Sequence, residues 1–346
     1  MSDTVGCTIE KKLLPTLLLN ESKHSRVFIP KQSDGVTEYA VFGKGDTPDL
    51  EAGQSRLSPK SFFFPQTETL YAFDYDTIEP SASEEAAEAP VVLFAVRPCD
   101  SASFELLDQV FGPENHGYHD PYYEKKRDNT IVVTLACNKP GSTCFCTSVG
   151  GDPAGTRGAD VLAFDLEDRL YLEGLTTKGK EFLARNGEVL KEAAETDREV
   201  ANTLASSARE SMPAVEYDRA TVKKNLDDQF DNPIWEKITN TCIGCGACTY
   251  LCPTCHCFDI CDEERHYKGR RIRTWDSCQY AQFTKHASGH NPRPTKTERL
   301  RQRFMHKFSY TVESVDEVYC VGCGRCVRYC PVNLDIREVL REFSST

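Results

Sequence analysis

The chain has 346 residues, 17 of them cysteine, and a formal net charge of −12 at pH 7. A chain of this length can bury a sizeable core, so the cysteines are not needed as disulfide staples, and an odd number cannot all pair internally. The acidic balance argues against a dedicated nucleic-acid binder. Thiols in this number therefore indicate metal or redox chemistry.

The early apolar run at residues 13–19 is too short to span a bilayer, and no small-residue cleavage site follows it. We interpret it as an amphipathic helix packed on the domain. The chain is accordingly expected in the cytoplasm, without a membrane span. In that reducing compartment, clustered thiols are more commonly metal-bound or free than paired in disulfides.

Residues 1–230 predict an α/β domain with a mixed sheet. Residues 91–96 and 131–136 are apolar, β-branched runs typical of buried strands, and a helix capped by Asp100 is expected between them. This order predicts a right-handed parallel βαβ unit. The remaining predictions are shorter strands at 26–29, 38–42, 70–73, 161–164 and 170–172, an exposed acidic loop at 79–90, and mostly helix at 177–229.

The last third of the chain carries one cysteine pattern twice. Residues 242–253 and 320–331 both read Cys-x₂-Cys-x₂-Cys-x₃-Cys-Pro, the run of bacterial-type iron–sulfur proteins. Three thiolates on a tight, glycine-containing loop wrap a cubane, and the fourth cysteine ligates the other cluster. The expected ligands are Cys242, Cys245, Cys248 and Cys330 for one [4Fe-4S] cluster, and Cys320, Cys323, Cys326 and Cys252 for the other.

We expect two domains in an α+β chain. Residues 1–230 form the α/β domain, and residues 231–346 form a mainly helical ferredoxin-like domain with two [4Fe-4S] clusters. The insert between Cys252 and Cys320 is long for a ferredoxin, and this length favours helices over a small β-rich domain. A pair of zinc sites is the alternative, but zinc sites use two separated Cys-x-x-Cys pairs.

The insert between the motifs is basic. Residues 265–307 contain twelve Lys or Arg against two acidic residues. A solvated helical face is one interpretation. The others are cations that ease reduction of an anionic cluster, or a surface that docks an acidic partner. No nucleic-acid motif accompanies the charge, so nucleic acid is not an expected partner.

Four further cysteines belong to the first domain: Cys99, Cys137, Cys144 and Cys146. Cys99 and Cys137 follow the two predicted parallel strands, whose carboxyl ends are where α/β sheets bind ligands. We expect all four to converge at one sheet edge as ligands of a third iron–sulfur cluster. Buried free thiols are the alternative.

The last group is Cys255, Cys257, Cys261 and Cys278. Its spacing matches no common metal site, so we interpret these thiols as packing residues, with metal ligation as the alternative. Cys7 stands alone.

No catalytic motif accompanies the cysteines. The sequence lacks a Gly-x-Gly-x-x-Gly run after a strand, a Walker A run, Gly-x-Ser-x-Gly and His-Glu-x-x-His. Arg97 and Asp100 are expected to order a loop. No catalytic residue is predicted.

Taken together, these segments resemble the iron–sulfur β subunit of cytosolic sulfhydrogenases and the A subunit of anaerobic sulfite reductases. The resemblance covers about residues 58–335. It is carried by residues 58–68, Val-Arg-Pro-Cys-Asp at 96–100, Thr-Cys-Phe-Cys at 143–146, Cys-Pro-Thr-Cys-His-Cys-Phe-Asp at 252–259, Trp-Asp-Ser-Cys at 275–278, Gly-His-Asn-Pro-Arg at 289–293 and Cys-Val-Gly-Cys-Gly-Arg at 320–325. One departure is Cys261, where this family is expected to have an acidic residue.

The resemblance implies an electron-transfer subunit of a hetero-oligomer rather than an enzyme by itself. Such a subunit relays single electrons between a flavin-containing NAD(P)H-binding subunit and a catalytic partner of the hydrogenase, sulfite reductase or heterodisulfide reductase type. The alternative is a self-contained iron–sulfur reductase with chemistry at the N-terminal cluster.

Overall fold

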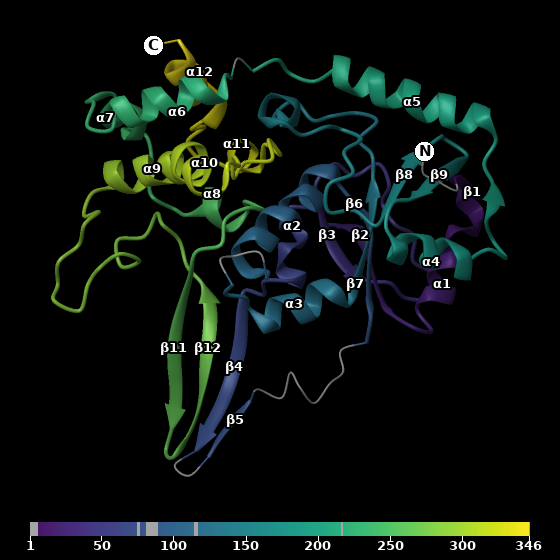
Figure 1. Cartoon of the computed structure of the whole chain (residues 1–346), viewed down its shortest axis with the longest axis horizontal. Helices are drawn as coiled ribbons and strands as arrows, with labels where there is room; N and C mark the ends of the chain where they lie inside the picture. The colour runs from purple at the N-terminus through teal and green to yellow at the C-terminus, as the bar shows by residue number, and fades with distance from the viewer. Residues whose placement is uncertain (1–5, 75–76, 81–88, 114–116, 216, 346) are drawn as a thin grey trace.

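The structure, a computed structural model, describes residues 6–74, 77–80, 89–113, 117–215 and 217–345. Most of the acidic loop predicted at 79–90 lies outside the described residues. Within them, an α/β layer, a helical part and a narrow projecting sheet are arranged as Figure 1 shows. No described helix is long and apolar enough to cross a membrane.

The main sheet has eight strands in the order β10-β1-β9-β8-β7-β6-β2-β3. The inner strands β2, β6, β7 and β8 pair in parallel, while the flanking pairs are antiparallel, so the sheet is mixed as predicted. The strands are β1 (Gly6–Glu10), β2 (Arg26–Ser33), β3 (Val36–Val41), β6 (Val91–Val96), β7 (Thr130–Leu135), β8 (Val161–Asp165), β9 (Arg169–Gly174) and β10 (Lys191–Glu192).

Helices cover both faces of this sheet because the inner strands are apolar on both sides. Helices α1 (Leu14–Glu21) and α4 (Thr177–Arg185) pack on the face that carries Val92 and Phe94. Helices α2 (Pro98–Phe111) and α3 (Pro121–Asp128) pack on the opposite face. The run at 13–19 is thus a packed helix, and the βαβ unit is confirmed.

The helical part is built around the aromatic side chains of Trp235, Phe304 and Phe343. Its helices are α6 (Arg219–Asp228), α7 (Ile234–Thr239), α8 (Ala247–Tyr250), α9 (Lys296–Met305), α10 (Thr311–Val315), α11 (Arg325–Arg328) and α12 (Ile336–Ser344), with a π-helical turn at His306–Tyr310. Helix α5 (Glu195–Glu210) packs on the main sheet through Ala201 and Ala205.

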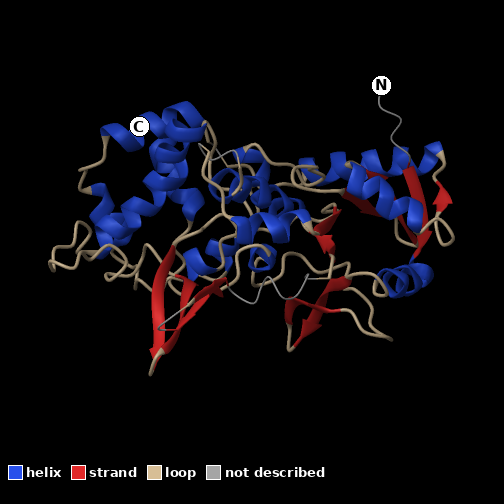
Figure 2. Ribbon diagram, turned by 60° about the horizontal axis from the view of Figure 1, so that its bottom comes forward, coloured by secondary structure: helices blue, strands red, loops and turns tan. Residues whose placement is uncertain are grey.

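The insert between the motifs contains a hairpin that the sequence reading did not predict. Strands β11 (Phe258–Arg265) and β12 (Lys268–Trp275) pair with β4 (Thr67–Asp74) and β5 (Ile78–Pro80) to form a second, four-stranded sheet. Figure 2 shows this sheet extending away from the helices. The strand predicted at 70–73 therefore pairs with a segment from the last third of the chain, which no local pattern reveals.

A buried ion pair joins the two halves of the chain. The Arg325 guanidinium donates to both carboxylate oxygens of Asp100 at 2.7 Å, and its Nε donates to the carbonyl of Ser55 at 2.8 Å. Both side chains are 2% exposed or less. The sequence predicts Asp100 as the helix cap. In the structure α2 starts at Pro98 instead, and the Asp100 carboxylate, in the first turn of α2, binds Arg325.

We predict that Asp100→Ala lowers the stability of the chain by about 3–5 kcal/mol, because it leaves the Arg325 charge buried without a partner. The measurement is denaturant unfolding under anaerobic conditions. Asp262→Ala is the matched control, since its pair with Arg271 is 42% exposed on each side, and such pairs contribute about 0–1 kcal/mol. Equal effects of the two substitutions would contradict the assignment.

Candidate functional site: cysteine groups along the two motifs

Both ferredoxin motifs fold as a tight loop followed by a single helical turn. Gly244 and Gly246 in the first motif and Gly322 and Gly324 in the second all have φ between 61° and 77°. This left-handed backbone suits glycine. Helices α8 and α11 begin directly after the second glycine of each pair, so the third cysteine of each motif lies on that turn.

The structure brings Cys330 to the first motif. Cys242, Cys245, Cys248 and Cys330 line one small apolar cavity beneath α8. Backbone amides already face two of these thiols, because Gly244 N–H donates to Cys242 Sγ at 3.4 Å and Leu334 N–H donates to Cys330 Sγ at 3.2 Å. Such N–H···S bonds are typical around cluster sulfurs.

Cys252 lies with the second motif. Burial raises the pKa of the Cys320 and Cys326 thiols, and it raises the pKa of Cys323 to about 12. The nearby Cys252 thiol raises the pKa of all three further. Iron binds thiolates, so ligation must displace the protons that burial retains on these thiols. As the side chains are placed among the described residues, no three His, Cys, Asp or Glu side chains lie so that they could hold a metal ion.

Three cations are buried around Cys252. Lys307 Nζ donates to Cys252 Sγ at 3.3 Å, Arg303 Nη1 donates to Cys255 Sγ at 3.4 Å, and Lys60 Nζ donates to the carbonyls of Cys252 and Cys255 at 2.9 and 2.7 Å. All three side chains are at most 4% exposed. Burial lowers the pKa of Lys307, but Cys252 and Cys255 outweigh it and raise the pKa overall, so Lys307 stays charged.

Many of the basic side chains of the insert form ion pairs within the chain. Arg273 pairs with Glu68 and Asp120 at the base of the second sheet. Arginines of the hairpin and of α9 are also paired, as in the pairs Arg270–Glu263, Arg271–Asp262 and Arg301–Asp231. Of the twelve cations of the insert, Arg303 and Lys307 are the two that donate to thiols among the described residues. The interpretation that cations of the insert ease reduction of a cluster stays a prediction for these two.

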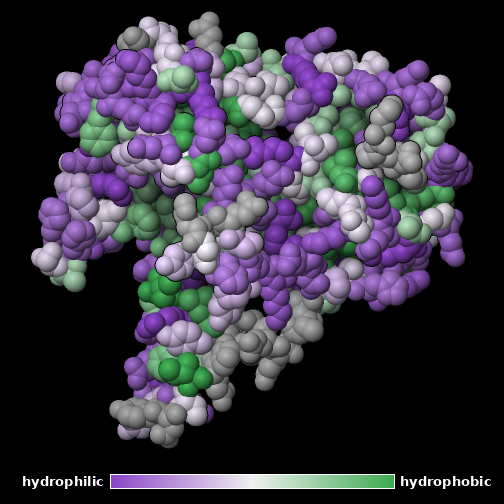
Figure 3. Space-filling view, viewed as in Figure 1, coloured by the Kyte–Doolittle hydropathy of each residue, from purple (hydrophilic) through white to green (hydrophobic). Residues whose placement is uncertain are grey.

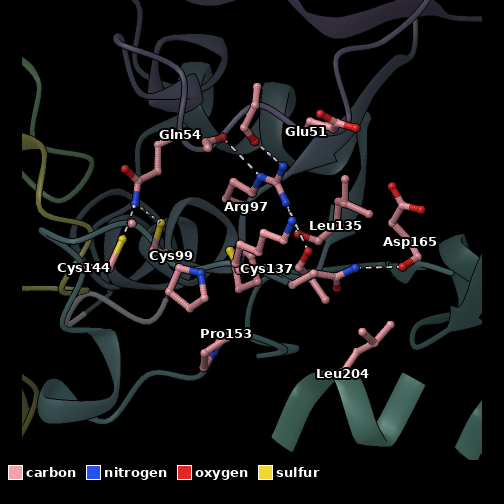
Figure 4. Close-up of a pocket in the computed structure, with 18 of the residues that line it drawn as sticks. Glu51, Gln54, Arg97, Cys99, Leu135, Cys137, Cys144, Pro153, Asp165 and Leu204 are labelled. Carbon is pink, nitrogen blue, oxygen red and sulfur yellow. Dashed lines mark hydrogen bonds between the residues drawn. The ribbon is translucent and has the colours of Figure 1, made fainter. Parts of the chain in front are cut away.

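The four N-terminal cysteines line a single cavity of about 760 Å³ at the carboxyl edge of the main sheet. Figure 4 shows Cys99, Cys137 and Cys144 facing it, with Gln54 above them. Gln54 Nε2 lies 3.3 Å from Cys144 Sγ and 3.9 Å from Cys99 Sγ. Burial raises the pKa of Cys146 to about 12. The donor set, four thiols with an amide donor, fits an iron–sulfur cluster.

A bulge and an arginine shape this edge. Ala95 has φ 60°, and the β6–β7 register shifts there, just before Arg97. Arg97 donates to carbonyls on two sides, those of Leu50, Ala52 and Gly53 and that of Ala136. As expected, Arg97 orders a loop, and that loop carries Gln54.

The loop with Cys144 and Cys146 packs directly on the second ferredoxin motif. Phe145 N–H donates to the carbonyl of Gly322 at 2.8 Å. A Cβ on Gly322 would lie 2.5 Å from the Cys146 backbone, and one on Gly324 would lie 2.3 Å from the Thr143 carbonyl. Glycine is therefore required at both positions for this approach as well as for the turn.

The last cysteine group splits in two. Cys261 is exposed on β11, whereas Cys255, Cys257 and Cys278 lie together beside the motifs. Sequence reasoning missed Lys60 and Gln54 as neighbours of these sites. Both lie far from any cysteine in sequence. Lys60 is in a short 3-10 helix, Pro59–Phe62, within the 58–68 stretch that carried the resemblance, whereas Gln54 had no such signal.

Comparison with known proteins agrees with this geometry. A family model described as a 4Fe-4S dicluster domain matches residues 241–334. The chain is 31% identical over 322 residues to the sulfhydrogenase 2 subunit beta of Pyrococcus furiosus, covering 92% of each chain. The chain belongs to the sulfhydrogenase β-subunit family. It is an iron–sulfur electron-transfer protein with a 4Fe-4S dicluster domain.

We predict that Lys307→Met lowers the midpoint potential of the cluster beside Cys252, because the cation stabilises the added electron. A unit charge about 6 Å away is worth on the order of 2–3 kcal/mol at an effective dielectric of about 20, or roughly 100 mV for one electron. An anaerobic redox titration followed by EPR measures it. Lys307→Arg and Lys285→Met, the latter exposed on the same insert, are expected to shift the potential by much less.

Proposed function

We propose that this chain relays single electrons through three iron–sulfur clusters arranged in sequence. The observation that carries the proposal is the contact between neighbouring cysteine groups. The N-terminal group touches the second motif, since Cys99 packs with Cys323, and Cys144 Sγ lies 3.9 Å from the Cys323 carbonyl. The second motif shares Cys252 and Arg303 with the first.

The assignment follows the contacts. One [4Fe-4S] cluster takes Cys242, Cys245, Cys248 and Cys330, and the second takes Cys252, Cys320, Cys323 and Cys326. The third takes Cys99, Cys137, Cys144 and Cys146. Each cluster supplies one-electron chemistry, and the chain holds the three in a fixed order.

The first motif is the point of exchange with a partner. Ile243 is 64% exposed and Cys245 is exposed, whereas Val321 and Cys323 at the equivalent positions of the second motif are 9% and 7% exposed. An apolar side chain over a cluster gives a partner a dry contact. The other members of the complex are a flavin-containing NAD(P)H-binding subunit and a catalytic oxidoreductase subunit.

The second sheet offers a further contact for such a complex. Ile78, Ile260 and Tyr267 on it are between 47% and 74% exposed. Figure 3 shows hydrophobic groups on this projection, on a face that is otherwise mainly hydrophilic. Exposed apolar side chains that form a contiguous patch mark protein–protein contacts, and these three support such a contact on the second sheet.

We predict that Cys99→Ala removes about four irons per chain, since a cubane holds about four, and spares the two ferredoxin clusters. Anaerobic iron analysis and EPR measure both quantities. Cys7→Ala on β1, outside all three groups, is expected to change neither. Unchanged iron in Cys99→Ala would remove the third cluster from the relay.

Ile243→Asp tests the exchange point. We expect it to slow reduction of the clusters by NAD(P)H plus the flavoprotein by at least tenfold, because it places a charge in the contact, while the iron content is retained. Stopped-flow bleaching of the cluster absorbance gives the rate. Leu19→Asp on α1 is the control, with a 40% exposed side chain far from the motifs. Equal rates in the unsubstituted chain and both variants would contradict the docking site.

A self-contained reductase is the second candidate, and the 760 Å³ cavity favours it. Cavities of this size hold small-molecule ligands. Lys139 and Arg328 line it, and their side chains have no hydrogen-bond or ion-pair partner among the described residues. Turnover of an acceptor by the isolated, chemically reduced chain would establish this candidate over the relay.

A further inference from the structure

We propose that residues 280–296, the docking loop, bind an acidic face of the flavin-containing partner subunit. The inference rests on the proposed function, because it takes the first motif as the point of electron exchange. It adds the chemistry of the partner at that point, which is a group of carboxylates on a protein surface. The docking loop extends from β12 to the start of α9, and Figures 1 and 2 show it on the side of the helical part that faces away from the main sheet.

The docking loop is held against the first motif at both of its ends. Tyr280 Oη donates to the carbonyl of Cys245 at 3.3 Å. At the other end, Lys296 Nζ donates to the carbonyl of Cys242 at 2.9 Å. These two contacts lie on either side of Ile243 in the motif, and the Ile243 side chain is 64% exposed. A partner that covers Ile243 therefore meets the docking loop as well.

The docking loop carries positive charge without any carboxylate to balance it. Its cations are Lys285, Arg293 and Lys296, and residues 277–297 contain no Asp or Glu. Lys285 and Lys296 are exposed, and none of the three cations forms an ion pair with another residue in the described part of the chain. The charges of the two lysines are therefore available to a partner.

Other cations of the same insert have partners within the chain. Arg270 and Arg271 pair with carboxylates of the hairpin, and Arg301 pairs with Asp231. By contrast, the docking loop is an unbalanced positive site on a chain whose net charge is −12. Such a site attracts and orients an acidic surface, because the remainder of the chain repels it.

The docking loop is ordered by hydrogen bonds of its own. Asn291 Nδ2 donates to the carbonyl of Ala281 at 2.6 Å, and Thr284 Oγ1 donates to Asn291 Oδ1 at 2.8 Å. Arg299 of α9 donates to the carbonyl of Arg293 at 3.1 Å. A surface that is already ordered loses less conformational entropy when a partner binds. The cations of the docking loop are therefore held in place for a partner.

The contact fits a small interface whose association is steered by charge. Its apolar part at the motif is the Ile243 side chain, whereas obligate interfaces are larger and more apolar. Charges at the rim of an interface act mainly on the association rate and its salt dependence. Nucleic acid, another polyanion, fits the site less well, because no nucleic-acid motif accompanies the docking loop.

The test follows cluster reduction by NAD(P)H and the flavoprotein in anaerobic stopped-flow experiments at several salt concentrations. For the unsubstituted chain we expect the second-order rate constant to fall about tenfold from low to high salt, because salt screens the attraction. Lys285→Glu should lower the low-salt rate constant by about five- to tenfold and flatten the salt dependence, with the iron content unchanged. Lys44→Glu, at an exposed lysine after β3, is the matched control and should change neither.

The dissociation constant between the chain and the flavoprotein, measured by biolayer interferometry at low salt, is a readout that needs no electron transfer. We expect Lys285→Glu to weaken binding about fivefold and Lys44→Glu to leave it unchanged. Equal effects of the two substitutions, or a reduction rate that rises with salt, would overturn the proposal. So would tighter binding of a single-stranded oligonucleotide than of the flavoprotein, lost in Lys285→Glu.

The same experiments separate this inference from the proposed function. If Ile243→Asp slows reduction while salt and Lys285→Glu do not, the docking loop is excluded and the first motif remains the exchange point. If Ile243→Asp leaves reduction unchanged while Lys285→Glu weakens binding, the exchange point is excluded and the docking loop remains.

Discussion

The buried pair between Asp100 and Arg325 is the constraint on which the arrangement of the cysteines depends. Asp100 lies next to Cys99 at the start of α2, and Arg325 lies between Cys323 and Cys326 in the second motif. A pair with both charges desolvated tolerates little displacement, since separating them leaves each charge buried alone. It therefore holds the N-terminal cysteine group and the second motif in one register. The Ser55 and Arg97 hydrogen bonds extend that register to the loop with Gln54.

The two motifs differ in exposure: the second is buried, whereas the first reaches the surface of the molecule. The second motif is enclosed by the Cys144–Cys146 loop, Arg325 and Lys307, so a cluster held by its cysteines would be buried. The first motif carries Ile243 at the surface. Buried cations near Cys252 favour the reduced state of an inner centre, because they stabilise the added negative charge. Buried cations that stabilise a reduced centre therefore lie near the second motif, while the first motif offers the exposed contact with a partner.

The second sheet links these features to the rest of the chain. Its hairpin begins directly after Cys257 and ends at Trp275, shortly before Cys278. Strand β4, from the first part of the chain, pairs with β12. Lys60, which precedes β4, contacts the Trp275 ring and the backbone of Cys252 and Cys255. The projection is therefore anchored beside the Cys252–Cys255 segment and Cys257. A partner bound along it would lie close to them.

Much of the fold was determined by sequence patterns that depend only on near neighbours. The apolar runs at 91–96 and 131–136 predict the parallel strands, and the repeated cysteine spacing predicts the dicluster domain, because period and spacing act over a few positions. Convergence of Cys99 and Cys137 followed from the polarity of parallel strands.

Only the tertiary structure decided the remaining features. Pairing of β4 with β12, burial of Lys60 beside Cys255, and the meeting of Cys257 with Cys278 join segments that are distant in the sequence. Local propensity carries no information about such contacts. These contacts form only in the compact chain, because buried charges and strand edges are stabilised by partners from distant segments.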